Sequence, residues 1–573
     1  MLQTLTTPRG ETLSGTPWQV YPRPQMRRDS YINLNGEWDF AVSSGKPETF
    51  DMRITVPFCP ESRLSGIGRH FEEGAPLWYR RRFLLPEGFR RKRVLLHIGA
   101  ADQTAEVFVN GQHLCRHEGG YASFCVDITE ALAEENELVI RCTDDLHDQA
   151  FPYGKQVMNR GGMWYTPVSG IWQTVWLESV PGTYIENLNI ENHGASVTIS
   201  TVPPLEGTVS VEPLGQFPLE NGQVTIAPEN PHFWCPDDPY LYHFTLETAQ
   251  DKVESYFAIR SLEIKKVGEY PRLCLNGKPY FFHGLLDQGY WPEGLLTAPA
   301  PESYADDILA MKRLGFNTLR KHIKVEPEEF YYQCDRLGMI VWQDMVNNSS
   351  YSYFRDTVLP TIGLQKWNDR RLHLDERSRN AFRRGAADAV NQLKNHPCIC
   401  YWTIFNEGWG QFDSDRVCGW FRTLDATRFI DTTSGWFRGK NTDVDSRHQY
   451  FGKLRLEGDG LRPLVLSEFG GKTWRVEGHI FNPDKTYGYG ACPTREALNE
   501  AVAALYRESI VPAVEKGLCA AIYTQVSDVE DEVNGLITYD RRVVKLDADT
   551  MLPISRALQD AMEKTVASFE KMG

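Results

Sequence analysis

The rhythm of the sequence changes near residue 262, and this change constrains the fold more than any other feature. Before it, short hydrophobic runs follow one another with turn residues between them. After it, hydrophobic runs alternate with longer segments of helical periodicity, such as 304–314 and 377–395. Eight strand–helix units fit into roughly 300 residues, which predicts a (β/α)8 TIM barrel over residues 262–573.

The part of the chain before residue 262 is predicted to form two β-sandwiches. The first, over residues 1–181, has runs such as 105–109, followed by Asn110-Gly111. Asn-Gly supplies the positive φ angles of a tight hairpin turn, and we predict a jelly-roll β-sandwich. The second, over residues 182–261, alternates on a smaller scale between proline-rich stretches, and we predict an immunoglobulin-like β-sandwich.

Composition excludes several classes of partner. The net charge of −15 and the absence of a basic stripe argue against nucleic acid. No apolar run approaches about 18 residues, so no membrane partner is expected. The first residues lack a secretory signal, so we expect a cytoplasmic protein. The 12 cysteines form no CxxC pair and are interpreted as reduced, buried thiols. The oligomeric state stays open, with a homo-oligomer among the alternatives.

Two glutamates stand at the ends of predicted barrel strands. An aromatic and β-branched run, 401–405, leads into Asn406-Glu407, and another, 463–467, leads into Glu468. Active sites of barrel enzymes lie at the C-terminal ends of the strands. Glu407 ends the fourth predicted strand and Glu468 the seventh, so both side chains can converge over the central pocket. Two such carboxyl groups are what retaining glycoside hydrolysis requires.

The neighbours of the two glutamates indicate their roles. The amide of Asn406 can hydrogen-bond the sugar hydroxyl next to the reacting carbon, so we predict that Glu407 is the acid/base and Glu468 the nucleophile. Double displacement requires carboxyl groups about 5–5.5 Å apart. Partial burial and a neighbouring negative charge raise the pKa of one carboxyl group, which is how identical side chains take different roles.

Several short motifs carry a family resemblance that extends over nearly the whole chain. They lie at 33–38, 78–81, 109–111, 169–172, 234–242, 257–260, 275–279, 317–320, 406–407 and 468–470. On these motifs the chain resembles glycoside hydrolase family 2, the family of β-galactosidases, β-glucuronidases and β-mannosidases. The resemblance implies the layout of jelly roll, immunoglobulin-like sandwich and barrel. It also implies a retaining mechanism, in which Asn406-Glu407 matches the acid/base motif and Glu468 the nucleophile.

Other residues at predicted strand ends are candidates for sugar contact. Arg320 matches the family's strand-end arginine, and the resemblance implies a buried partner that keeps the nucleophile ionised, in preference to direct substrate contact. The family often has a tyrosine near its nucleophile, which here is Tyr450. For each of the remaining candidates a purely structural role is the alternative; they are Asp287, His322, Asp344, His448, Trp409, Trp436 and Trp474.

Differences from the motifs of the family's branches narrow the range of sugars expected as substrate. Glucuronidases carry an Asn-x-Lys motif near the end of the barrel, whereas the nearest match here contains Glu532, which would repel an acidic sugar. Gly162 replaces the aspartate that precedes a Met-Trp pair in the galactosidase branch, whose metal-assisted site is therefore not expected. The stretch 341–344 resembles the mannosidase branch, but Phe405 replaces one of two adjacent amides before the acid.

We therefore expect a retaining exo-β-glycosidase that acts on a terminal neutral β-linked sugar of a small carbohydrate substrate. A β-galactosidase-like specificity is preferred, β-mannosidase or another family 2 specificity is the alternative, and glucuronidase is disfavoured. No cofactor and no metal are expected. The rival from another class is a catalytically inactive carbohydrate-binding protein, although such a protein usually loses one of its two acids.

Overall fold

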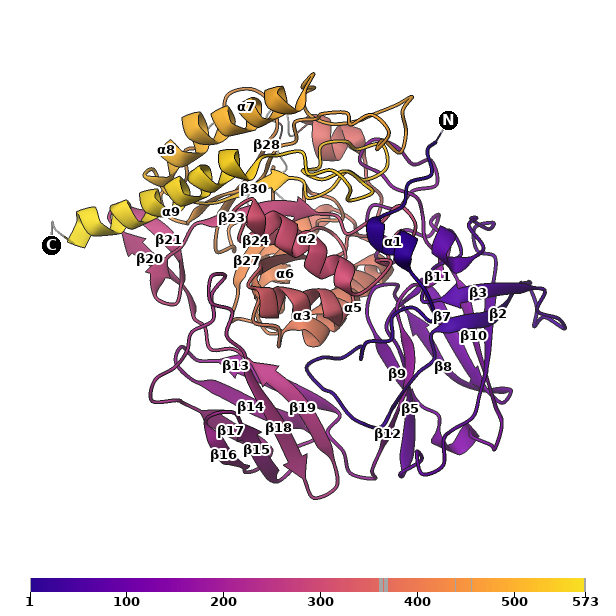
Figure 1. The fold of residues 1–573 in the computed structure, drawn as a ribbon. Coiled ribbons are helices and arrows are strands. Elements are labelled where there is room, and N and C mark those ends of the chain that lie inside the picture. The colour runs from indigo at the N-terminus through magenta and orange to yellow at the C-terminus, as the bar shows by residue number, and fades with distance from the viewer. Residues whose placement is uncertain (1, 360–363, 365–368, 438, 455, 571–573) are drawn as a thin grey trace.

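Three parts follow one another along the chain in the computed structural model, which describes residues 2–359, 364, 369–437, 439–454 and 456–570. Figure 1 shows the first sandwich in indigo and violet, a smaller sandwich below, and the barrel from magenta to yellow. The predicted fold class is thereby confirmed. The last strand of the first sandwich ends at Val180, and the second sandwich begins at Asn187.

The first sandwich packs a four-stranded antiparallel sheet against a six-stranded one, and their facing side chains form one hydrophobic cluster. Asn110 and Gly111 have φ angles of 50° and 82°, as the predicted hairpin turn between β7 and β8 requires. A two-stranded sheet, β6 with β11, lies at one end. The elements are α1 (Pro8–Thr12), β1 (Tyr31–Asn33), β2 (Gly36–Val42), β3 (Met52–Val56), η1 (Arg63–Ser65), β4 (Leu77–Phe83), β5 (Arg93–Ile98), β6 (Ala101–Asp102), β7 (Thr104–Val109), β8 (Gln112–Glu118), β9 (Phe124–Asp127), η2 (Thr129–Ala131), β10 (Asn136–Thr143), β11 (Gly170–Ile171) and β12 (Val175–Val180).

The second sandwich is smaller and has its own core. Alternate residues along β14 and β18 are buried, which is the period-two pattern of strands with one face on a core. The sheet orders are β13-β14-β17 and β16-β15-β18-β19. The strands are β13 (Asn187–Asn192), β14 (Val197–Val202), β15 (Gly207–Val211), β16 (Gly215–Leu219), β17 (Gln223–Ile226), β18 (Tyr242–Thr248) and β19 (Lys252–Phe257).

The barrel has eight parallel strands in the order β27-β26-β25-β24-β23-β30-β29-β28. At the two ends of this order, the Ser434 and Ser446 hydroxyls lie 3.3 Å apart and join β27 to β28. The strands are β23 (Phe282–Asp287), β24 (Thr318–Lys321), β25 (Ile340–Asp344), β26 (Ile399–Asn406), β27 (Phe429–Ser434), β28 (Asp445–Gln449), β29 (Leu464–Gly470) and β30 (Leu518–Thr524).

Helices cover the outside of the barrel (Figure 1). The side chain of Asp375 accepts hydrogen bonds from the first backbone amides of α5, which fixes where that helix begins. A three-stranded sheet, β20 (Leu262–Val267), β21 (Tyr270–Leu275) and β22 (Lys278–Pro279), precedes the barrel. The helices are α2 (Glu302–Arg313), α3 (Glu328–Leu337), η3 (Phe354–Val358), η4 (Asp369–Arg371), α5 (Glu376–Leu393), α6 (Ser414–Phe421), α7 (Arg495–Leu505), η5 (Tyr506–Ile510), α8 (Val511–Val514) and α9 (Ala548–Glu570).

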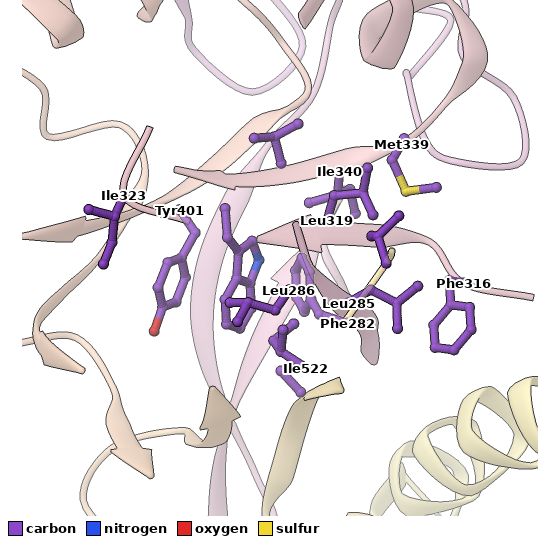
Figure 2. Close-up of a cluster of buried hydrophobic side chains, with 14 of the residues drawn as sticks. Phe282, Leu285, Leu286, Phe316, Leu319, Ile323, Met339, Ile340, Tyr401 and Ile522 are labelled. Carbon is purple, nitrogen blue, oxygen red and sulfur yellow. The ribbon is translucent and has the colours of Figure 1, made fainter. Parts of the chain in front are cut away.

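One large hydrophobic core fills the barrel and continues into the first sandwich. Figure 2 shows a part of it, in which Phe282, Leu319, Ile340 and Ile522 come from four different barrel strands or their ends. Trp172 of the first sandwich belongs to the same cluster. This shared core places loops of the first sandwich beside the C-terminal ends of the barrel strands.

Candidate active site

The two predicted catalytic glutamates meet at the mouth of the barrel. Glu407 directly follows the fully buried strand β26 and has a φ of +51°, while its amide donates to the Ser434 carbonyl of β27 at 2.9 Å. A non-glycine residue in the left-handed region of φ and ψ is strained by about 1–3 kcal/mol, and such residues are frequent at functional sites. One carboxylate oxygen of Glu407 and one of Glu468, in β29, lie within 4.8 Å of each other. This approach of the two carboxylates is consistent with the spacing of a retaining pair.

Glu468 is surrounded by groups that stabilise its charge. Its two oxygens accept hydrogen bonds from Arg320 Nη1 at 3.0 Å and from the Tyr450 hydroxyl at 2.5 Å, and His448 Nε2 lies 3.6 Å away. Burial alone would raise the pKa of Glu468, but His448, Arg320 and the Tyr450 hydroxyl outweigh burial and lower it to about 2. Glu468 is therefore ionised at neutral pH, as a nucleophile must be.

Arg320 connects the nucleophile to the residue before the acid. It is fully buried at the end of β24, and its guanidinium also donates to Asp344 Oδ1 at 2.9 Å and to Asn406 Oδ1 at 2.8 Å. Because the Asn406 oxygen accepts this bond, the amide nitrogen of Asn406 remains as the group that can donate to a ligand. Buried groups tied together in this way hold fixed positions.

His448 lies between the two glutamates. Its Nδ1 is 2.8 Å from Glu407 Oε1, and its Nε2 is 3.0 Å from the Ser434 hydroxyl and 3.3 Å from Arg320 Nη1. The Nδ1 contact ties the imidazole to the Glu407 carboxyl group, and the Nε2 contacts hold the other side of the ring. The histidine thus orients the proposed acid/base.

A pocket of about 500 Å³ opens over these residues. Glu407 and Glu468 lie on its wall, and three of its other residues, Lys155, Met163 and Trp164, come from the first sandwich. The pocket is therefore shared between two parts of the fold. The rest of its lining consists of Leu286, Gln288, His322, Ile323, Tyr351, Asn406, Trp409, Tyr450, Tyr489, Thr524 and Glu532.

Of the predicted sugar-contact residues, Asn406, His322, Tyr450 and Trp409 line this pocket. Burial, and then the positive charge of Lys155, lower the pKa of His322, so the imidazole is neutral at neutral pH. The Trp409 ring packs edge-on against Trp164 at 5.1 Å between ring centres, and Trp409 is only 3% exposed. An edge-on, buried ring supports the wall of a pocket more readily than it offers a face for stacking.

Four other predicted residues are engaged elsewhere. Asp344 is buried between Arg320 and His322 Nδ1, the latter at 2.6 Å, and Asp287 forms a 2.6 Å ion pair with Lys321. Trp436 packs edge-on against His448 at 5.7 Å, and Trp474 packs against the outside of the hydrophobic core. None of these four, Asp287, Asp344, Trp436 and Trp474, is among the described residues that line the pocket, so we do not propose them as sugar contacts.

Several pocket residues were not predicted as site residues from the sequence, among them Lys155 and Tyr489. Lys155 and Tyr489 lie in irregular segments, where no strand period marks a direction for the side chain. The Tyr489 ring stacks on Tyr450 with 3.9 Å between centres and an angle of 17° between planes. The stretch of glycines and tyrosines at 487–490 was the available signal, because such stretches are frequent in binding loops.

The cluster suits acid–base chemistry better than metal binding. One atom each of Glu407, His448 and Glu468 lie close enough to hold a metal ion. However, the guanidinium of Arg320 donates to Glu468 and brings a permanent positive charge into the cluster, which disfavours a second cation. In the part of the chain that the structure describes, no helix is long and apolar enough to cross a membrane.

Comparisons with known proteins place the chain in one family. Residues 69–160 match the model "Glycosyl hydrolase 2 galactose-binding domain-like", 183–260 match "Glycosyl hydrolases family 2", and 266–455 match "Glycosyl hydrolases family 2, TIM barrel domain". The three matches follow the order of the three parts of the fold.

Individual relatives are distant. A β-galactosidase of Thermoanaerobacter pseudethanolicus is 24% identical over 57% of this chain and 44% of its own length, and a β-glucuronidase of Bacteroides fragilis is 22% identical over 66% and 56%. The matched region thus spans about half the length of these relatives. In overall fold, the chain is similar to a β-glucuronidase of an uncultured Clostridium sp., with a TM-score of 0.70, 18% identity, and coverage of 96% of this chain and 100% of that one. Taken together, the three family matches show that this chain belongs to glycosyl hydrolase family 2.

Proposed function

We propose that the protein is a retaining exo-β-glycosidase that works by double displacement. The observation that carries this proposal is the pair of carboxylates within 4.8 Å, of which Glu468 is held ionised by Arg320 and Tyr450. Lys155, Met163 and Trp164 of the first sandwich form part of the pocket wall, and we propose that they limit the pocket to the end of a sugar chain, which corresponds to exo action.

Two steps follow from this arrangement. In the first, a Glu468 oxygen bonds to the anomeric carbon while the bond to the leaving oxygen breaks, and Glu407 gives that oxygen its proton. In the second, Glu407 takes a proton from water, the water oxygen bonds to the anomeric carbon, and the bond to Glu468 breaks. The Asn406 amide nitrogen is placed to bind the neighbouring sugar hydroxyl throughout.

The sequence motifs and the named relatives point to different sugars. The sequence motifs favour a neutral β-galactosyl unit, and one relative is named a β-galactosidase, but others are named β-glucuronidases. The mannosidase-like stretch that ends at Asp344 gives little support to β-mannosidase, because this carboxylate is engaged by Arg320 and His322.

Covalent trapping tests the proposed chemistry. A 2-deoxy-2-fluoroglycosyl fluoride should label the protein once per chain, and peptide mass mapping should place the label on Glu468. The variant Glu468→Ala should lose turnover of every aryl glycoside. Glu407→Ala should lose turnover of poor leaving groups and retain part of it for activated ones, since acid assistance matters less there.

Glu457→Ala, at an exposed position, serves as the control and should match the wild type. A label on another residue, or equal losses on both kinds of leaving group in Glu407→Ala, would contradict these roles. Sugar binding without turnover in the wild type would support the alternative hypothesis of a catalytically inactive carbohydrate-binding protein.

A further inference from the structure

Lys155 brings a positive charge into the pocket, and the described part of the chain supplies no hydrogen-bonded or ion-pair partner for it. Its side chain lines the same cavity as Glu407 and Glu468, although the residue belongs to the first sandwich. Its ammonium lies 5.9 Å from the centre of the Tyr165 ring. A cation at that distance over a ring gains only a weak attraction.

The backbone at Lys155 is hydrogen-bonded within the first sandwich and passes close to the barrel. The Tyr165 amide donates to the Lys155 carbonyl at 3.0 Å, and the Val157 amide donates to the Tyr165 carbonyl at 3.2 Å. The preceding residue, Gly154, has a φ of +65°, and a Cβ there would meet the Ile323 carbonyl of the barrel at 3.2 Å. Only glycine allows the backbone to pass this close to the barrel, so the Cα of Lys155 is fixed beside the mouth of the barrel.

The carboxylates of the pocket, in contrast, have partners. Glu468 pairs with Arg320, and Glu407 contacts His448. Glu532 is only 2% exposed, and its two oxygens accept hydrogen bonds from the Tyr165 hydroxyl at 2.5 Å and from the Asn534 amide at 3.1 Å. From the sequence, Glu532 is expected to repel an acidic sugar, but this carboxylate is buried and hydrogen-bonded. Lys155 is partly exposed, so its positive charge is the one that a ligand can reach.

We propose that the terminal sugar carries a carboxylate, as in a β-uronide, and that the ammonium of Lys155 binds it. This inference rests on the proposed glycosidase function and names its substrate class. When substrate fills the pocket and displaces water, an unpaired ammonium loses hydration, which is costly unless an anion replaces the water. A sugar carboxylate supplies that anion through a charge-assisted hydrogen bond, and a neutral hydroxymethyl group does not. Lys155 thereby acts as a specificity-determining residue contributed from outside the barrel.

The test compares kcat/KM for the 4-nitrophenyl β-glycosides of glucuronic acid, galacturonic acid, glucose and galactose. The wild type should prefer at least one uronide to its neutral counterpart. Lys155→Met should lose about 10- to 100-fold on that uronide, the usual effect of removing a hydrogen bond to a charged group, and change little on the neutral sugars. Lys155→Arg should retain a large part of the preference, and Lys92→Met, at an exposed site, should retain all of it.

A binding measurement keeps the test informative if Lys155→Met is poorly active for other reasons. Free glucuronate or galacturonate should raise the Tm of the wild type and leave that of Lys155→Met unchanged, while both proteins melt at similar temperatures without sugar. A wild type that prefers neutral glycosides, or equal losses on both classes in Lys155→Met, would overturn the inference. If Glu468 is labelled and neutral sugars are preferred, only this inference fails; if Glu468 is not labelled, the proposed function itself fails.

Discussion

Arg320 organises the site more than any other single residue. Its guanidinium reaches Asp344 of β25, Asn406 of β26, His448 of β28 and Glu468 of β29. Five donors in one planar group make this possible, and the side chain has no exposed surface. Arg320 itself is not among the described residues that line the pocket, but its guanidinium stabilises the charge of the nucleophile and fixes the direction of the Asn406 amide.

Replacing Arg320 by lysine should change the pH dependence of catalysis. In the wild type the pKa of Glu468 is lowered to about 2, so the nucleophile is ionised at neutral and at mildly acidic pH. Without the guanidinium, one of the groups that oppose the effect of burial is lost, so the pKa of Glu468 rises and a larger fraction of this carboxyl group is protonated as the pH falls. The acid limb of the kcat/KM profile should therefore move to higher pH by at least about one unit.

We expect Arg320→Lys also to lose about 100-fold in kcat/KM at neutral pH, because one ammonium cannot replace four directed contacts. The matched control is Arg93→Lys, which alters an exposed ion pair with Asp127 and should leave the profile unchanged. An acid limb at the same pH in Arg320→Lys and wild type would refute the role assigned to this residue.

At the scale of elements, the strands were predictable and the loops were not. Hydrophobic runs with a fixed period place Glu407 after the fourth strand and Glu468 in the seventh, and parallel strands bring such ends to one rim. In contrast, Asp287 is engaged by Lys321, which comes from the neighbouring strand. The position of Lys155 at the pocket depends on how the first sandwich packs against the barrel. Neither follows from local periodicity, so the predicted contact at Asp287 gained no support and Lys155 was missed.

The loop after β29 braces a residue in the loop after β28. Tyr489 stacks on Tyr450, and the Tyr489 amide donates to the Gly471 carbonyl at 2.9 Å, which anchors the ring beside the end of β29. Tyr450 in turn donates to Glu468. The stack therefore holds the tyrosine hydroxyl in hydrogen-bonding position on the nucleophile.

A double-mutant cycle tests this brace. Tyr450→Phe removes the hydroxyl and should lower kcat/KM about 10- to 100-fold, and Tyr489→Leu should lower it by about 10-fold through loss of alignment. Because both act on one contact, the double variant should be little worse than Tyr450→Phe alone, with a coupling of about 1 kcal/mol. Phe451→Leu, which changes an exposed ring packed edge-on against Tyr489, is the control. Strictly additive losses would show that the stack does not act through Tyr450.

At the scale of the whole molecule, the three parts share buried contacts. Trp172 of the first sandwich lies in the core cluster of the barrel, and the Thr297 hydroxyl donates to its carbonyl at 2.6 Å. Arg260, at the end of the second sandwich, is fully buried and donates to the Pro397 and Ile399 carbonyls at the start of β26. A buried guanidinium destabilises the fold if its acceptors are removed. The second sandwich and the barrel therefore each depend on the other for stability.

The barrel should therefore not fold as an independent unit, even though it has its own sheet. Expressed alone, residues 262–573 would expose the side chains that pack on Trp172 and leave the carbonyls that bind Arg260 without their partner, so we expect an aggregating chain that no fluorosugar labels. The intact chain should unfold in a single calorimetric transition, because parts that share a core lose their stability together. Arg260→Met should lower the Tm of the whole transition without splitting it. Separate transitions for the sandwiches and the barrel, or a fragment that gives a native-like circular dichroism spectrum and accepts the label at Glu468, would mean that the pocket needs nothing from the first sandwich, Lys155 included.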